Sequence, residues 1–559
     1  MQENQPMTGP RTRRMTGGEA IVAGLLAQGV DTLFGLPGAQ MYPLFDALAQ
    51  VPDQIRTIGA RHEQACGYMA FGYARSTGRT GVYSVVPGPG VLNTTAALAT
   101  AWGCNTPVVC LTGQIPSAFI GKRRGHLHEI ADQLGTLRSV VKWAERIERV
   151  EDAPALVAEA FRQAQSGRPG PVALEMAWDV MASSADVPEA LPAVLDPHPQ
   201  IDRQQLAGAL ALVAKAERPM IMTGSGAQHA SAAVTELARM IGAPVAAFRG
   251  GRGVVDETSA LGMSSYAASR YYADCDLVIG IGTRLEMPTM RWGDMMRVVD
   301  RLESAKLIRI DIDPAEMDRL KADVGLVADA ACAAEALVAA LTISGHRAAE
   351  NGAKIAAVKA QAARETAGVQ PQLAYLDVIR DVLPPDGLLV EELCQVGFAS
   401  YFAYPVQRPR TYVSTGFQGT LGFGFQTALG VKVAHPDKPV VSITGDGGFL
   451  FGVQELATAV QYGIGLVTVV FNNEAYGNVR RDQETRYGNR LIGADLVNPD
   501  FLMLAKAFGL DGHRVHAPAE LKPVLAAALA KGEPALIEVV LPRGSEASPW
   551  PFIHPVKSY

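Results

Sequence analysis

The sequence has few cysteines and no long apolar run. Its six cysteines are scattered along 559 residues, and no two of them form a CxxC pair. This spacing indicates neither a disulfide framework nor a zinc site and is compatible with a reducing compartment. No stretch of about 18 uninterrupted apolar residues occurs, and the polar start has no apolar core, so we expect neither a membrane span nor a signal peptide. These absences predict a cytoplasmic protein without a membrane partner.

Neither the net charge nor the glycine motifs of the sequence predict binding to a nucleic acid or a common type of nucleotide-binding site. Fifty basic and 56 acidic side chains give a net charge of −6, so no electrostatic attraction to nucleic acid is expected. The P-loop pattern GxxxxGK[ST] is absent, which excludes the usual nucleoside triphosphate site. Two strand-to-glycine turns, at residues 219–226 and 277–283, leave the GxGxxG pattern incomplete and are weak evidence for a dinucleotide.

The chain does contain a repeated alternation of strand-like and helical segments. Short apolar runs such as residues 82–86 and 107–111 end in polar or glycine-rich turns, and segments with helical spacing separate them. This pattern predicts an α/β fold of mostly parallel sheets flanked by helices. The length is sufficient for three or four domains.

Changes in composition suggest where the domains end. Residues 186–200 are rich in Pro and Ala and are typical of a linker, and a charged, Ala-rich link is expected around residues 344–367. The predicted organisation is a polar N-terminal tail (1–15), a first domain (16–185), a central domain (200–345), a third domain (370–542) and a C-terminal tail (543–559).

The most informative stretch is GDGG at residues 445–448, followed by a pair of asparagines at residues 472–473. We expect a strand at residues 439–444, a helix at 449–462 and a second strand at 466–471. Ligands of such parallel units bind beyond the carboxyl ends of the strands, where Asp446 and Asn473 lie. Their hard oxygens suit magnesium or calcium, and consecutive glycines allow a phosphate to approach the backbone. Each element alone could equally be an ordinary turn.

The pattern resembles the signature of thiamine diphosphate (ThDP) enzymes, in which GDG is followed, after the intervening residues (448–471 here), by NN. Within it, residues 454–459 and 473–477 resemble the acetolactate synthase branch of that family. The resemblance implies three α/β domains and a homodimer or homotetramer with active sites at subunit interfaces. It implies a magnesium ion held by Asp446, Asn473 and the carbonyl of Ala475. The full set of implied cofactor-binding residues is Pro89, Asn93, Gln395, Gly419, Leu421, Asp446, Gly447, Gly448, Asn473, Ala475, Tyr476 and Gly477.

Glu63 is the candidate for the carboxylic acid that this chemistry needs beside the aminopyrimidine of the cofactor. It lies in RHEQACGYMAFGYAR, which resembles the family segment that carries this glutamate. Such an acid works best when nearly desolvated, with a pKa raised toward neutrality. By itself the residue would more often be a helix cap or an exposed glutamate. The resemblance also places Gln114 and Gln40 at positions of family active-site residues.

The predicted substrate pocket departs from that of true acetolactate synthases. Asn478 and Asp482 occupy places where those enzymes have a Met and a Trp. A polar, charged wall suits a hydroxylated, carboxylated or CoA-bearing substrate better than an alkyl acceptor. His128, in the basic stretch at residues 121–129, belongs to a solvated loop or to a mobile cover that binds substrate. The apolar tail at residues 548–555 either covers the active-site mouth or packs on the surface.

Three functions remain open at this point. In the acetolactate synthase group the central domain binds FAD, ADP or no nucleotide; here Pro288 replaces an arginine of the FAD-associated pattern, which argues against FAD and leaves ADP as an alternative. A ThDP- and Mg2+-dependent lyase, decarboxylase or carboligase acting on a small 2-oxo acid or related carbonyl or 2-hydroxyacyl substrate is the first interpretation. The others are an FAD-containing oxidase and a binding protein that has lost catalysis.

Overall fold

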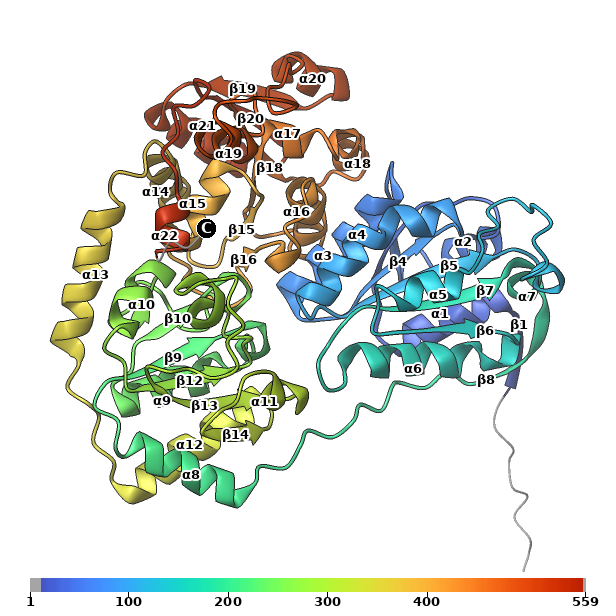
Figure 1. Ribbon diagram of the computed structural model, residues 1–559. Coiled ribbons are helices and arrows are strands. Elements are labelled where there is room, and N and C mark those ends of the chain that lie inside the picture. Colours follow the sequence, from blue (N-terminus) through green and yellow to red (C-terminus); the bar gives the residue numbers. More distant parts are fainter. Residues whose placement is uncertain (1–11, 556–559) are drawn as a thin grey trace, which may run out of the picture. The chain divides into compact units, whose positions relative to one another are not determined.

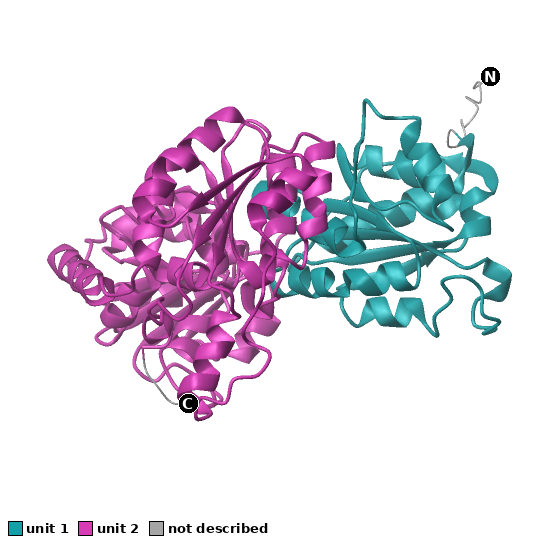
Figure 2. Ribbon diagram, turned by 90° about the horizontal axis from the view of Figure 1, so that it is seen from above, with its two compact units in different colours: residues 1–197 teal, residues 198–559 magenta. Residues whose placement is uncertain are grey.

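The computed structural model of the protein describes residues 12–555 and contains three six-stranded parallel sheets with helices on their faces (Figure 1). This confirms the predicted α/β class. The chain divides into two compact units, unit 1 at residues 1–197 and unit 2 at residues 198–559 (Figure 2). Unit 1 contains one of the six-stranded sheets, and unit 2 contains the other two. Among the described helices, none combines the length and apolar character needed to span a bilayer.

Unit 1 is built on a buried parallel sheet with strand order β3-β2-β4-β5-β7-β6. The strands are β2 (Thr32–Gly35), β3 (Arg56–Gly59), β4 (Gly81–Val85), β5 (Val108–Gln114), β6 (Trp143–Ile147) and β7 (Val172–Ala177). The helices are α1 (Gly17–Ala27), α2 (Tyr42–Ala49), α3 (Glu63–Thr77), α4 (Pro89–Gly103), α5 (Gln133–Arg138), α6 (Ala153–Gln165) and α7 (Trp178–Ala182). Most strand residues are buried, as expected for a parallel sheet covered on both faces.

The last residues of the N-terminal tail predicted for residues 1–15 belong to a strand. Residues 1–11 lie outside the described part of the chain, but β1 (Thr12–Thr16) pairs antiparallel with β8 (Ser184–Pro188). The side chain of Thr16 accepts a hydrogen bond from the amide of Glu19 and caps α1. Residues 189–202 follow β8 without a helix or strand, as the Pro- and Ala-rich composition predicts.

The central sheet of unit 2 has strand order β11-β10-β9-β12-β13-β14. Its strands are β9 (Pro219–Thr223), β10 (Val245–Ala247), β11 (Gly262–Met263), β12 (Leu277–Ile281), β13 (Lys306–Asp311) and β14 (Val324–Val327). Its helices are α8 (Arg203–Val213), α9 (Ser231–Ile241), α10 (Ser265–Tyr272), α11 (Ala315–Arg319), α12 (Ala330–Ser344) and α13 (Gly352–Thr366). The second link, expected around residues 344–367, is therefore mostly the helix α13, because its alanines and charged residues also favour a helix.

The third sheet has strand order β16-β15-β17-β18-β20-β19. Its strands are β15 (Leu388–Glu391), β16 (Tyr412–Val413), β17 (Val440–Gly445), β18 (Val467–Asn472), β19 (Asp511–Val515) and β20 (Ala535–Val540). Its helices are α14 (Gln372–Val382), α15 (Gln395–Ala403), α16 (Phe423–Ala434), α17 (Asp446–Phe449), α18 (Leu456–Gln461), α19 (Gly477–Arg486), α20 (Phe501–Phe508), α21 (Pro518–Lys531) and α22 (Trp550–Ile553). The single helix expected at residues 449–462 is wrong: α17 ends at Phe449, and α18 begins only at Leu456.

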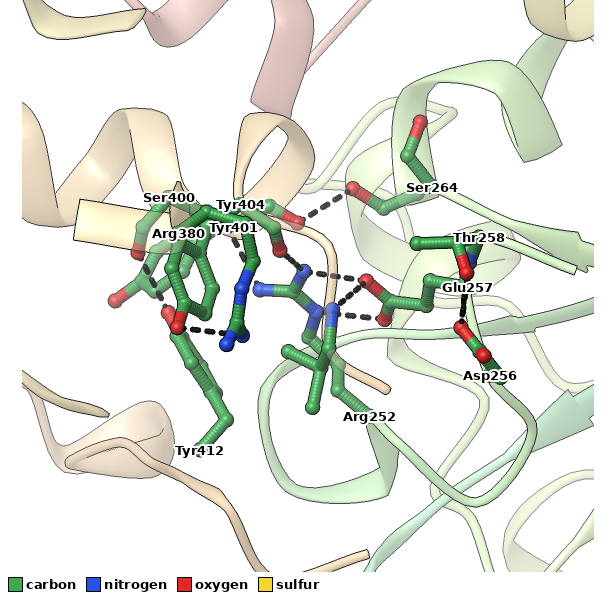
Figure 3. Close-up of polar contacts among 12 residues, drawn as sticks. Arg252, Asp256, Glu257, Thr258, Ser264, Arg380, Ser400, Tyr401, Tyr404 and Tyr412 are labelled. Atoms are coloured by element: carbon green, nitrogen blue, oxygen red, sulfur yellow. Dashed lines mark hydrogen bonds and ion pairs between the residues drawn. The ribbon is translucent and has the colours of Figure 1, made fainter. Parts of the chain in front are cut away.

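A buried ion pair joins the two halves of unit 2 (Figure 3). Arg252, which follows β10, pairs with Glu257 through Nε–Oε1 and Nη2–Oε2 distances of 2.8 and 2.6 Å, and both side chains are almost fully buried. Arg252 also donates to the carbonyls of Ser400 and Tyr404 at the end of α15 and lies over the ring of Tyr412. One apolar cluster includes residues of both sheets. The helix α15 is therefore held against the central domain.

Replacing Arg252 by Ala should destabilise unit 2 strongly. The substitution leaves Glu257 buried without its cation, a change that costs about 3–5 kcal/mol. Urea unfolding followed by circular dichroism measures the effect. Arg239→Ala is the control, because Arg239 pairs with Glu236 on an exposed surface and such pairs contribute about 0–1 kcal/mol. Equal midpoints for the two variants would contradict the role given to Arg252.

Candidate active site

The carboxyl ends of β17 and β18 bring the GDGG stretch and the asparagine pair together. The strands are parallel neighbours, and Gly445 is in register with Phe471. Asp446 is the first residue of α17, and Asn472 is the last residue of β18. Two segments separated by residues 448–471 therefore meet at one edge of the third sheet, as the sequence predicts.

Asp446 is buried, 2% exposed, and its hydrogen-bond partners are neutral. Nδ2 of Asn498 donates to its Oδ2 at 2.7 Å, and the backbone amides of Gly447 and Ala475 also bond to the carboxyl group. Burial raises the pKa of Asp446 above its ordinary value. In the described part of the chain no Lys, Arg or His forms an ion pair with this carboxylate. A buried carboxylate of this kind is a good ligand for a cation.

The two asparagines, Asn472 and Asn473, have different hydrogen-bond partners. Nδ2 of Asn472 donates to Glu538 at 2.8 Å, and its Oδ1 accepts from Asn498 at 2.9 Å, so this residue is held within the sheet. The amide of Asn473 faces Glu546, whose Oε2 accepts from its Nδ2 at 2.5 Å. Oδ1 of Asn473 accepts from the amide of Ala475 at 3.2 Å. Asn473 and Ala475 are thus adjacent near Asp446, where a metal ion would need them.

The glycines of this stretch also have a packing role. Glu392, buried after β15, accepts from the amides of Gly422 and Gly424 and from Oγ1 of Thr444. A Cβ atom on Gly448 or Gly424 would collide with the Glu392 carboxylate, and burial raises the pKa of that group.

On the other side of α17 the limiting neighbour is an aromatic ring. A Cβ atom on Gly447 would collide with the ring of Tyr476. A Cβ atom on Gly477, the first residue of α19, would lie 2.9 Å from Nδ2 of Asn473. The backbone beside Asp446 and Asn473 therefore has no room for side chains, which accounts for the glycines at these positions.

Other predicted cofactor residues lie around the same sheet edge. Gln395, the first residue of α15, is buried, and its Oε1 accepts from Arg481 at 2.9 Å. Gly419 has a left-handed conformation with φ of 58°, which glycine adopts without strain. Leu421 is half-buried, in the turn before α16. The roles of these residues toward ThDP stay predictions.

The C-terminal tail packs against these residues, up to residue 555 where the described part ends. Arg481 donates to the backbone carbonyl of Glu546, and Nε1 of Trp550 donates to Oδ1 of Asn478. Trp550 begins α22 and contacts the ring of Phe398 in α15. These contacts place residues of the tail beside Arg481 and Asn478, and its role as a cover of the active-site mouth stays a prediction. Asp482, the second pocket candidate, is half-buried and lies 3.6 Å from Arg486.

A half-buried, arginine-rich cluster lies beside the tail helix. Arg291 donates to Oε1 of Glu286 at 2.6 Å and contacts Nε2 of His554, whose ring stacks on Trp550. Nη1 of Arg249 lies 3.5 Å from the same glutamate oxygen, and Arg284 also lowers the pKa of that carboxyl. Burial and Arg291 lower the pKa of His554 to about 4, so this ring is neutral at pH 7. The cluster therefore carries an excess of positive charge.

In unit 1, Glu63 and Asn93 face each other. Glu63 is the first residue of α3, and its Oε2 accepts from Nδ2 of Asn93 at 3.0 Å. Asn93 lies in α4, which begins at Pro89. Glu63 is half-buried, so its carboxylate is within reach of a ligand. The structure thus brings Glu63 together with Asn93, and the predicted cofactor residue Pro89 begins the same helix as Asn93.

Gln40 and His128 are also brought together. Nδ1 of His128 lies 2.7 Å from Oε1 of Gln40, and Nε2 of Gln40 donates to the carbonyl of Leu127 at 2.7 Å. Gln114, by contrast, is buried at the end of β5, where its amide bonds to Ile115 and Glu175. Its role as an active-site residue, which the family resemblance implies, stays a prediction.

The glycine-rich turns of the central domain have a structural explanation. The amide of Gly226 donates to the carbonyl of Gly282 at 3.1 Å, and a Cβ atom on Gly224 would collide with that carbonyl. Close packing of the two turns therefore accounts for these glycines without a nucleotide. Pro288, the residue that argued against FAD, lies in a short π-helix at Met287–Arg291.

Three important residues of the site were not among the predicted ones: Asn498, Glu546 and Glu392. Asn498 bridges Asp446 and Asn472, and Glu546 bonds Asn473, although both come from later parts of the chain. Burial raises the pKa of Glu546 to about 7. Glu392 directly follows Glu391, the last residue of β15, and this adjacent acidic pair is the one sequence signal that could have indicated it.

This arrangement fits ThDP and magnesium. The donors at the metal position are carboxylate, amide and carbonyl oxygens, which are the ligands that magnesium prefers. The buried carboxyl group of Asp446 has no cationic partner among the described residues, and Gly447 and Gly448 follow it at the start of α17. Asp446, Asn473 and the carbonyl of Ala475 would hold the ion.

Comparison with known families agrees with this geometry. Residues 15–136 match the N-terminal TPP (thiamine pyrophosphate) binding domain of thiamine pyrophosphate enzymes, residues 206–337 match their central domain, and residues 394–539 match their C-terminal TPP binding domain. The chain belongs to the thiamine pyrophosphate, or ThDP, enzyme family. Within this family it is acetolactate synthase-like, as its relatives show.

Three relatives illustrate the similarity. A probable acetolactate synthase large subunit of Methanocaldococcus jannaschii is 35% identical over 94% of this chain and 92% of its own length. The acetolactate synthase isozyme 2 large subunit of Escherichia coli is 32% identical, over 97% and 98%. The probable 2-ketoarginine decarboxylase AruI of Pseudomonas aeruginosa is 32% identical, over 96% and 95%. The similarity extends over nearly the whole chain in each case.

Glu391, next to Glu392, is a buried carboxyl group whose ionisation should affect the stability of unit 2. It is fully buried at the end of β15, and Tyr401 donates to its Oε1 at 3.3 Å. Its Oε2 has no hydrogen-bond partner among the described residues. Burial raises its pKa from 4.5 to about 7.

The variant Glu391→Gln should reduce the loss of stability that accompanies rising pH. Because the folded-state pKa is the higher one, the contribution is fully present below pH 4.5 and is lost as pH rises through about 7. That difference corresponds to roughly 3 kcal/mol. Urea unfolding between pH 4.5 and 8 measures it, with exposed Glu335→Gln as control. An unchanged slope in Glu391→Gln would contradict the assignment.

Proposed function

We propose that the protein is a ThDP- and Mg2+-dependent enzyme that breaks or forms a carbon–carbon bond next to a carbonyl group, without a redox cofactor. The observation that carries the proposal is the buried edge of the third sheet, where Asp446 lies beside Asn473 and Ala475 with no cationic partner among the described residues. Membership of the ThDP enzymes supports the cofactor, and the two kinds of relative, synthase and decarboxylase, support the reaction class.

The substrate is proposed to be a small 2-oxo acid or a related anionic carbonyl compound. The pocket candidate Asn478 bonds Trp550, and Trp550 stacks on His554 of the arginine-rich cluster. Excess positive charge next to a polar wall favours a substrate with a carboxylate over one with only an alkyl chain. The decarboxylase relative AruI is named for an oxo acid of this polar kind, 2-ketoarginine.

The protein's own groups would bind, orient and transfer protons. When bound, ThDP supplies a nucleophilic carbon and an acceptor for the electron pair that carbon–carbon cleavage releases. Asp446, Asn473 and Ala475 would hold the metal and thereby the diphosphate. Glu63, kept in place by Asn93, would hold a proton at the aminopyrimidine nitrogen. The linked pair Gln40 and His128 would handle a proton on the substrate.

By resemblance to the family, Glu63 of one subunit serves the third domain of another. We therefore propose that the active form is a homodimer or homotetramer. Size-exclusion chromatography with light scattering measures the assembly. A strictly monomeric active enzyme would contradict this part of the proposal.

The substitution Glu63→Gln should abolish turnover and leave Mg2+-dependent ThDP binding intact, because it removes a proton-holding group and keeps the hydrogen bond with Asn93 possible. Loss of a general acid or base typically costs about 10²–10⁴ in rate. The assay is mass spectrometry of products from 2-oxo acids, 2-hydroxyacyl-CoA esters, cyclic diketones and aldehyde pairs, with calorimetry for ThDP. Exposed Glu148→Gln is the control. Normal turnover by Glu63→Gln would refute its role.

A further inference from the structure

A second group of metal-binding side chains lies in the central domain of unit 2. Its members are His198 in the segment before α8, His229 in the turn before α9, Asp329 at the N-cap of α12 and Cys332 in the first turn of that helix. None of these residues belongs to the ThDP site described above.

Three of the side chains have potential ligand atoms close to one another. The nearest donor atoms of His198, Asp329 and Cys332 all lie within 4.8 Å of one another. In a tetrahedral zinc site with bonds of 2.0–2.3 Å, donor atoms lie about 3.3–3.8 Å apart. Small side-chain rotations of the two exposed residues, His198 and Cys332, would close the difference.

Asp329 is fixed by its own partners. Its Oδ1 accepts from the amides of Ala331 and Cys332 at 3.0 and 3.1 Å, and its Oδ2 meets Nε2 of His229 at 2.7 Å. The residue is 6% exposed. Helix amides therefore hold one oxygen of this carboxylate, and an imidazole holds the other. Metal-ligating side chains are usually oriented by hydrogen-bond partners in this way.

The donor types select the metal. Imidazole, thiolate and carboxylate together suit zinc and similar borderline ions, whereas magnesium and calcium prefer oxygen donors alone. The hard-oxygen site at Asp446 and this mixed site therefore call for different ions. The exposed positions of His198 and Cys332 leave an entry path from solvent.

We propose that His198, Asp329 and Cys332 bind one zinc-class ion, with His229 orienting the Asp329 carboxylate and water in the fourth position. The ion would fix the linker to α12. Residues 189–202 contain no helix or strand, and their last side-chain anchor in unit 1 is Asp196, which bonds Arg162 at 2.7 and 2.8 Å. Coordination of the ion by His198, two residues after Asp196, would give the linker a second anchor point.

The cysteine spacing gave no sign of this site, since only one cysteine takes part and the other donors come from distant segments. Among the described cysteines, Cys332 is the one classed as exposed; the others are buried or half-buried. A thiolate-to-metal charge-transfer band that appears on addition of metal can therefore be assigned to Cys332.

The test is a cobalt titration of full-length protein that has been stripped with a chelator and dialysed. We expect one Co2+ per chain with a thiolate-to-cobalt charge-transfer band, and displacement of that band by one equivalent of Zn2+. Cys332→Ser should remove the band, and His198→Ala should weaken binding at least about tenfold. His229→Ala should weaken binding but keep the band. Exposed His516→Ala is the matched control and should change nothing.

Two results would overturn the proposal. One is the absence of a charge-transfer band in the stripped wild-type protein. The other is a band of normal intensity in Cys332→Ser, which would place the thiolate elsewhere. Cys332→Ser should keep Mg2+-dependent ThDP binding, so calorimetry with ThDP distinguishes failure at this site from misfolding and from failure of the proposed function.

Discussion

The parallel pairing of β17 with β18 is the constraint on which the candidate active site depends. Its register sets Gly445 opposite Phe471, so the residues that follow both strands emerge at the same edge of the sheet. Buried polar groups there must be hydrogen-bonded, and Asn498 satisfies two of them at once by bridging Asp446 and Asn472. What remains is a buried carboxyl group that no basic side chain neutralises in the described chain, and this supports our proposal that Asp446 holds a metal ion.

The rest of unit 2 keeps this edge in place. The buried Arg252–Glu257 pair holds the end of α15 against the central domain, and the first residue of the same helix, Gln395, reaches Arg481. The tail then joins Glu546 to Asn473. Removing one side chain of a pair would leave the other buried without a polar partner, which costs free energy. These contacts therefore specify one arrangement of α15, the tail and Asn473.

How much of this could be predicted depends on how far apart in the chain the partners lie. Asp446 and Asn473 belong to one strand–helix–strand unit, and a local motif was enough to pair them. Asn498, Glu546 and the Arg252 contacts join distant segments, which no local pattern shows. The break after Phe449 was also missed, because residues 449–462 have helical spacing and length, while Gly452 packs against Gln426. The mixed site around Asp329 was missed for the same reason as Asn498, since its donors come from distant parts of the chain.

The most direct measurement is calorimetric binding of ThDP to the variants Asp446→Asn and Asp482→Asn in the presence and absence of magnesium. Asp446 lies at the buried sheet edge, whereas Asp482 lies in α19, 3.6 Å from Arg486. If the sheet edge holds the metal and the diphosphate, Asp446→Asn lowers the magnesium-dependent affinity at least about tenfold, and Asp482→Asn leaves it unchanged. Equal affinities for wild type and Asp446→Asn would contradict the assignment of the site.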